Sequence, residues 1–150
     1  MTVSSHKVIS LAREWIGTPY QHQVSLKGVG ADCLGLIRGI YRELYNKDPE
    51  GIPNYSADWA EARHQETMLL GARCYLEEVS KSESQVGDVL VFRLRAHFVA
   101  KHAGLLSFNN KMIHAIEQAP VSEVHLSPWW QRRIAGVFRF PSLHSSGVEK

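Results

Sequence analysis

The hydrophobic pattern of this chain changes its period near Val86, and this change limits the fold more than any other feature. Before it, apolar residues recur at helical spacing. After it, short apolar runs alternate with turn residues. Helices that precede a set of consecutive strands are typical of an α+β arrangement, because such strands pair with their neighbours into an antiparallel sheet. The sequence therefore predicts N-terminal helices packed on one small antiparallel sheet.

The first part of the chain predicts three helices. Their expected ranges are 8–16, 33–45 and 57–71, and the segment 21–31 is expected to be a loop. The second helix contains Gly35 and Gly39, one turn apart. Glycine costs about 1 kcal/mol inside a helix, so we expect another backbone to approach closely there.

The second part predicts five strands, at 89–92, 102–107, 111–116, 121–126 and 136–140. Asn109-Asn110 is typical of a tight hairpin turn between two of them. With 150 residues, the chain has the size of one ordinary domain. We expect a single domain over 1–141 and a frayed polar tail over 142–150.

Composition excludes several classes of function. Lys and Arg exceed Asp and Glu by two, and the longest basic run is Arg132-Arg133, so nucleic acid is not an expected partner. The first fifteen residues carry too many charges for a signal peptide, and no apolar run of about 20 residues occurs, so we expect cytoplasmic synthesis without membrane insertion. Without a secretory signal, no structural disulfide is expected, and Cys74 is predicted to be a buried small apolar residue.

Cys33 is the strongest candidate for chemistry. It lies where the glycine-containing loop ending in Gly30-Ala31-Asp32 meets the second predicted helix. The unpaired N–H groups of a first helical turn stabilise a thiolate, which can lower a cysteine pKa from about 8.5 to roughly 3.5–7.5. A nucleophile is the favoured interpretation, and an inert buried thiol is the alternative.

His102 and His114 follow Cys33, each inside a strand-like apolar run. Cysteine, histidine and a second polar group, in that order, are typical of a papain-like nucleophile system. His102 alone could be a core histidine. His114 could face solvent, with Glu117 or Gln118 in its place.

Metal binding is the other use that histidines could have. His97, His102 and His114 could bind zinc, but the chain has no H-E-x-x-H or C-x-x-C motif, so neither a metal nor another cofactor is expected.

Five segments in sequence order carry a resemblance to a known family. They are Gly17-Thr18-Pro19-Tyr20, Gly30-Ala31-Asp32-Cys33-Leu34-Gly35-Leu36, Val86-Gly87-Asp88-Val89-Leu90-Val91-Phe92, His102-Ala103-Gly104 and Ile113-His114-Ala115. Together they resemble the NlpC/P60 cell-wall cysteine peptidases, over nearly the whole chain, and most closely the compact form found in tailed phages and gene-transfer particles. The resemblance implies a papain-like α+β fold.

The same resemblance implies the role of each site residue. Cys33 is the expected nucleophile, His102 the general base and His114 the residue that orients the His102 ring. Tyr20 is expected to line the cleft and to assist the Cys33 backbone N–H in binding the oxyanion. Asp32 is expected to hold an amine of the substrate.

The resemblance also implies a substrate, the bond between D-glutamate and diaminopimelate in peptidoglycan stem peptides. Leu34 stands where family members that act on free muropeptides commonly carry a small hydroxyl residue, which favours intact peptidoglycan as the substrate. Phage or gene-transfer-particle tail proteins are the implied partners, with action in the periplasm or cell wall. Two alternatives stay open: a tail-hub assembly protein in which catalysis is dispensable, and an amidase or acyltransferase that uses the same cysteine and histidine.

Overall fold

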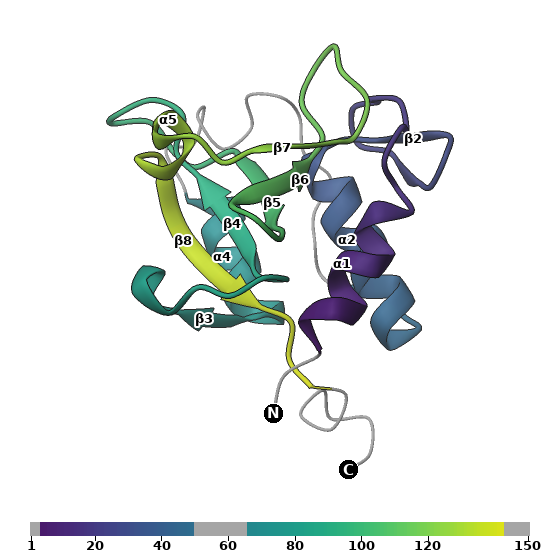
Figure 1. Ribbon diagram of the computed structural model, residues 1–150, viewed down its shortest axis with the longest axis horizontal. Helices are drawn as coiled ribbons and strands as arrows, with labels where there is room; N and C mark the ends of the chain where they lie inside the picture. The colour runs from purple at the N-terminus through teal and green to yellow at the C-terminus, as the bar shows by residue number, and fades with distance from the viewer. Residues whose placement is uncertain (1–3, 50–65, 143–150) are drawn as a thin grey trace.

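The computed structural model describes residues 4–49 and 66–142, and its helices precede most of its strands (Figure 1). Its elements are α1 (Ser5–Arg13), β1 (Ser25–Leu26), β2 (Gly30–Ala31), α2 (Cys33–Tyr45), α4 (Thr67–Tyr75), β3 (Glu77–Val79), the 3-10 helix η1 (Lys81–Glu83), β4 (Val89–Phe92), β5 (His102–Leu106), β6 (Lys111–His114), β7 (Ser122–His125), α5 (Pro128–Gln131) and β8 (Ile134–Arg139).

One antiparallel sheet organises the described residues, with its strands in the order β3-β8-β4-β5-β6-β7. The turn between β5 and β6 places Asn109 and Asn110 at φ 58° and 57°, the left-handed region that tight hairpin turns use and that asparagine tolerates. In Figure 1, α1 and α2 lie together beside the sheet, and α5 lies toward its opposite side. The predicted α+β papain-like fold is confirmed.

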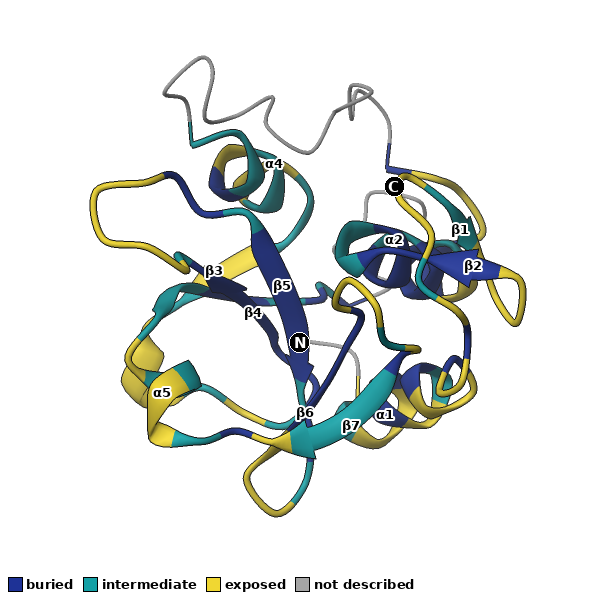
Figure 2. Cartoon of the chain, turned by 90° about the horizontal axis from the view of Figure 1, so that it is seen from above, coloured by how far each residue is buried: buried dark blue, intermediate teal, exposed yellow. Residues whose placement is uncertain are grey.

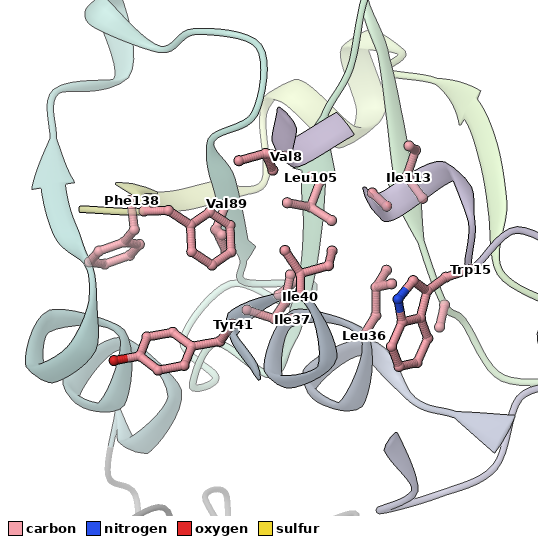
Figure 3. Packing of buried hydrophobic residues seen from close by; sticks show 14 of the residues in the cluster. Val8, Trp15, Leu36, Ile37, Ile40, Tyr41, Val89, Leu105, Ile113 and Phe138 are labelled. Atoms are coloured by element: carbon pink, nitrogen blue, oxygen red, sulfur yellow. The ribbon is translucent and has the colours of Figure 1, made fainter. Parts of the chain in front are cut away.

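Helix α2 supplies much of the core. Leu36, Ile37 and Ile40 are buried and point toward the sheet, where Leu105 and Val89 receive them (Figure 3). Figure 2 shows that buried residues dominate α2, β4 and β5. Burial of an aliphatic side chain contributes about 1.5–3 kcal/mol, so this contact fixes α2 on the sheet.

The two faces of the sheet contact different elements, because side chains alternate along a strand. Ala103 and Leu105 belong to the cluster that includes α2, whereas Phe92 and Met112 belong to a second cluster with Trp130 of α5. His102 precedes Ala103 and therefore projects toward the face that α5 covers.

The glycines of α2 are sites of close approach, as expected. A Cβ on Gly35 would lie 2.0 Å from the carbonyl oxygen of Val24, and one on Gly39 would lie 2.1 Å from the ring of Trp15. The first neighbour is backbone, as predicted, but the second is a side chain.

Several expectations about local structure were wrong. The first helix ends at Arg13, short of residue 16, and α4 continues through Gly71 to Tyr75; the expected helical residues 57–65 lie outside the described residues. Strand β3 was not predicted, and the expected loop 21–31 contains the short pair β1–β2. Cys74 is exposed, because it lies on the outer part of α4 where no strand covers it; both cysteines are free.

The single domain over 1–141 stays a prediction, and the expected tail lies outside the described residues apart from Ser142, which is buried. Within 4–49 and 66–142, no helix has both the length and the apolar character needed to cross a membrane.

Candidate active site

Asp32 fixes the position of Cys33 at the start of α2. Its Oδ1 accepts the backbone N–H of Gly35 at 2.7 Å, which caps the helix, and its Oδ2 accepts the backbone N–H of Gln23 at 2.7 Å. The carboxylate is 3% exposed. One side chain therefore joins the preceding loop to the first turn of the helix that carries the thiol.

The sulfur of Cys33 lies against the main chain on both sides of His102. The thiol donates to the carbonyl of Lys101 over 3.8 Å, and the backbone N–H of Ala103 is directed at the sulfur. Strand β6 ends at His114, which pairs with Gly104, so β6 does not extend to Ala103. The thiol lies beside this edge of β5. The fold thus brings together two residues that are 69 positions apart in the sequence.

The electrostatic state of Cys33 differs from the prediction. Burial, and to a lesser extent the neighbouring Asp32 carboxylate, raise the pKa of the thiol to about 12. The backbone N–H groups of Ala103, Leu34 and Cys33 lower the pKa, but by less. The predicted lowering of the Cys33 pKa was wrong, because the stabilisation at the helix start is smaller than the desolvation of the sulfur, although Cys33 as a whole residue is partly exposed.

His102 and His114 form a buried pair. Nε2 of His102 lies 2.9 Å from Nδ1 of His114, and the residues are 6% and 4% exposed. Because Nε2 is engaged, Nδ1 is the nitrogen of His102 that remains for the thiol proton. Nδ1 is also the ring nitrogen nearer to its own main chain, where the Cys33 sulfur lies.

Aromatic rings enclose this pair. The His102 ring centroid lies 5.4 Å from that of Trp130 and 5.7 Å from that of Phe92. Burial lowers the pKa of His102 to about 3, with a smaller contribution from His114, and lowers the pKa of His114 to about 4. Both histidines are therefore neutral at pH 7, and the resting site is a neutral thiol beside a neutral imidazole.

The structure also brings Tyr20 to this region. It is partly buried and bridges to Ala31, and burial raises the pKa of its phenol to about 12, with contributions from the charges of Asp32 and Cys33. The phenol therefore keeps its proton at neutral pH and can donate it in a hydrogen bond. Its role in the cleft stays a prediction, as does amine recognition by Asp32, whose two oxygens already accept backbone N–H groups.

The comparison with protein families gives a clear result. The NlpC/P60 family model matches residues 17–139, which include Tyr20, Cys33, His102 and His114. The chain belongs to the NlpC/P60 family. A curated relative, the gamma-DL-glutamyl hydrolase of Bacillus subtilis (strain 168), is 27% identical over 137 residues, which are 91% of this chain and 29% of that protein. This NlpC/P60 chain therefore spans less than a third of that relative's length.

Solved NlpC/P60 structures share the fold. The NlpC/p60 domain of the peptidoglycan hydrolase SagA is 19% identical, with a TM-score of 0.63 over 92% of this chain and 100% of that one. An NlpC/P60 family protein from Bacillus cereus ATCC 10987 is 21% identical, with a TM-score of 0.64 over 94% and 41%. The peptidoglycan hydrolase RipB from Mycobacterium tuberculosis is 21% identical, with a TM-score of 0.58 over 92% and 65%.

The alternatives for the third site residue differ in their placement. Glu117 and Gln118 are exposed, and in the structure it is His114 that contacts His102.

His97 is exposed, and among the described residues of this NlpC/P60 chain no group of histidines, cysteines or carboxylates could hold a metal ion.

Trp130 is a site residue to which the sequence did not point. Its contact with the histidines depends on the path of α5 across the sheet, and no local pattern shows that path.

An apolar cavity of about 290 Å³ adjoins the site on the α2 side of the sheet. Leu34 and Ala103, which follow Cys33 and His102 in the chain, line its near end, and Met68 and Tyr75 of α4 line its far part. Of the described residues that line it, Arg38 is the charged one, and the Nε of this side chain is buried without a hydrogen-bond partner among the described residues.

The buried histidine pair predicts a marked acid sensitivity of folding. The pKa of each histidine is lower in the folded chain than the value near 6.5 expected after unfolding, so between these values the unfolded chain binds more protons. Stability is complete above pH 6.5 and falls below it, by up to about 1.4 kcal/mol per pH unit for each histidine. Urea unfolding of the wild type from pH 7.5 to 5 measures this slope.

Two variants test whether the buried histidine pair causes this loss of stability at low pH. A His102→Gln/His114→Gln variant is expected to show a much flatter stability between pH 6.5 and 5, whereas replacement of the exposed His125 by Gln leaves the slope unchanged. If the free energy of unfolding depended equally on pH in all three proteins, the acid sensitivity would not arise from His102 and His114.

Proposed function

We propose that this chain is a cysteine peptidase that hydrolyses amide bonds of peptidoglycan stem peptides. The observation that carries the proposal is the placement of Cys33 Sγ against the backbone of His102, whose ring is held through Nε2 by His114. A nucleophile, a base and a residue that orients the base are the parts that thiol acyl transfer needs. The peptidoglycan hydrolases among the related structures support the choice of substrate.

The geometry supports a two-step reaction. Nδ1 of His102 takes the proton of Cys33, and the sulfur attacks the amide carbonyl. The carbon–nitrogen bond breaks as His102 returns the proton to the leaving amine. In the second step His102 takes a proton from water, and the resulting hydroxide attacks the thioester. The carboxylic product leaves and the thiol is regenerated.

A free N–H group stabilises the negative oxygen formed in each step. The backbone N–H of Cys33 at the helix start is suited to this role, and the protonated Tyr20 phenol is a second donor. Loss of one such donor typically slows acyl transfer by roughly 100- to 1000-fold.

The bond between D-glutamate and diaminopimelate is the proposed point of cleavage. The Bacillus subtilis relative is named for the hydrolysis of gamma-glutamyl bonds, which supports a gamma-linked glutamyl group on the acyl side. Leu34 in place of a small hydroxyl residue supports intact peptidoglycan over free peptides.

The test is the release of soluble fragments from purified diaminopimelate-type peptidoglycan. We expect the wild type to release fragments with a new diaminopimelate amino terminus, and Cys33→Ala to lower the rate by at least about 1000-fold, because the nucleophile acts as one unit with its base. Cys74→Ala is the matched control, since it makes the same change at the exposed cysteine and should retain activity. A folded wild type that releases nothing would contradict the proposal and favour an assembly protein.

A second candidate, an amidase or acyltransferase on an apolar acyl substrate, has one observation in its favour. The cavity beyond Leu34 and Ala103 is almost wholly apolar, and an acyl chain bound at Cys33 could extend into it. Hydrolysis of nitrophenyl esters that quickens steadily with acyl length, without fragment release, would favour this candidate. Association with phage or gene-transfer-particle tails stays a prediction from the resemblance.

A further inference from the structure

Three rings surround the imidazole of His102 on the face of the sheet that α5 covers. Trp130 lies at 5.4 Å between ring centroids and 32° between planes, Phe92 at 5.7 Å and 35°, and His114 at 5.1 Å and 79°. Two aromatic rings are thus tilted by 32° and 35° to the plane of His102, one on α5 and one on β4. Neither was linked to the chemistry by the sequence.

The reaction gives this ring a positive charge, and the thiolate formed with it is its direct counter-charge. His114 from β6 is the titratable group whose side chain contacts His102, and Cys33 from the start of α2 lies against the backbone of the residues on either side of it. From the α5 side, the guanidinium of Arg133 lies over Trp129, 3.7 Å from its ring centroid. Among the residues that the structure describes, no carboxylate hydrogen-bonds to either histidine ring.

We propose that Trp130 is a positioning residue that stabilises the protonated form of His102 through the electron-rich face of its indole. A cation within about 6 Å of an aromatic centroid is attracted by the ring quadrupole, most strongly by tryptophan and more strongly where water is excluded. The proposal rests on the proposed role of His102 as the base. It adds a residue on a different element to the site, beside the imidazole that His114 already holds through Nε2.

The position of Trp130 is firmly held, which this role requires. Pro128 begins α5, and the side-chain amide of Gln131 donates to the carbonyl of Leu126 at 2.9 Å. Trp130 also contacts His114 nearly edge to face, at 5.3 Å and 86°. One indole therefore contacts both histidines, and its plane is tilted by 32° to that of the ring that takes the proton.

The experiment measures the rate at which iodoacetamide alkylates Cys33, which needs the thiolate and protonated His102 but no peptidoglycan. The protein carries Cys74→Ala so that only Cys33 reacts. Trp130→Leu is expected to slow alkylation at pH 7 by about tenfold, and Trp130→Phe by about threefold, since phenylalanine keeps a weaker quadrupole.

A shape-preserving change separates charge stabilisation from packing. Biosynthetic replacement of tryptophan by difluorotryptophan withdraws electron density from the indole face with little change in size. We expect it to slow alkylation by about threefold in the Trp130-containing protein. In the Trp130→Phe protein, where the other tryptophans still carry fluorine, it should have no effect.

The outcomes are distinct. Equal alkylation rates with and without fluorine at Trp130 would overturn the proposal, even if Trp130→Leu failed to fold. Sensitivity to fluorine that survives in Trp130→Phe would also overturn it, since another tryptophan would then be responsible. The expected fluorine effect in a protein that releases no peptidoglycan fragments would support the role of Trp130 while rejecting the proposed substrate.

Discussion

Replacing His102 by alanine is expected to slow alkylation of Cys33 at pH 6–7 by at least about 100-fold, the usual contribution of a positioned base. It should also change the pH dependence. In the wild type the proton moves from Cys33 to His102 without a change in net charge, so the rate should be nearly flat from pH 5 to 9, between the lowered pKa of His102 and the raised pKa of Cys33. Without His102 the thiol must lose its proton to water, and the rate should rise about tenfold per pH unit.

The flat profile depends on the attraction between the two charges formed together. Burial penalises a lone thiolate or a lone imidazolium, but opposite charges about 4 Å apart attract by about 4 kcal/mol at the effective dielectric of a protein surface and by more in the interior. His125→Ala, a change at an exposed histidine, is the control and should behave as the wild type. A wild-type rate that climbs with pH as steeply as that of His102→Ala would exclude His102 as the base.

Replacing Gly35 by alanine is expected to destabilise the fold by about 3 kcal/mol or more. The added Cβ would lie 2.0 Å from the carbonyl oxygen of Val24 and 3.0 Å from Oδ1 of Asp32, and the first of these is backbone that cannot move without displacing the loop before Cys33. Overpacking of this kind usually costs about 1–3 kcal/mol, and rigid neighbours place it at the upper end. Urea unfolding measures the change.

Gly71→Ala is the matched control, because Gly71 is also helical, but outside its own helix and chain neighbours no atom of the described residues lies within 4 Å of its Cβ position. Here the helix propensity of alanine acts alone and should stabilise the chain by up to about 1 kcal/mol. Similar effects of the two substitutions would show that the loop does not press on the start of α2.

The start of α2 was predictable because its signals are local. A capping aspartate, a glycine-containing loop and an apolar period of 3.6 lie within a few residues of Cys33, and the observed helix Cys33–Tyr45 has the predicted bounds. The same local argument failed for the thiol pKa. Desolvation depends on what the rest of the chain places around the sulfur, including the backbone of Ala103.

For the histidines, too, the contacts made by distant parts of the chain could not be predicted from local sequence patterns. The pair of His102 and His114 was predicted from the resemblance to the family, with Glu117 or Gln118 left open as alternatives. His114 reaches His102 because β5 and β6 form a hairpin with a short turn. Trp130 reaches His102 only because α5 crosses the sheet after β7, a contact between segments with no shared periodicity. Strand β3 escaped prediction for a related reason: Glu77–Val79 pairs with β8, far along the chain, and two of its three residues are exposed.

Asp32 links the stability of the start of α2 to the acidity of the Cys33 thiol. Its carboxylate holds the loop to the first turn of α2, and its charge opposes the formation of a thiolate at the next residue. A neutral residue at this position would make the thiol more acidic, but it would lose at least one of the two hydrogen bonds that the carboxylate accepts, because the amide oxygen of asparagine replaces only one carboxylate oxygen. An acidic thiol and a firm connection between the loop and α2 therefore make opposite demands on the same side chain.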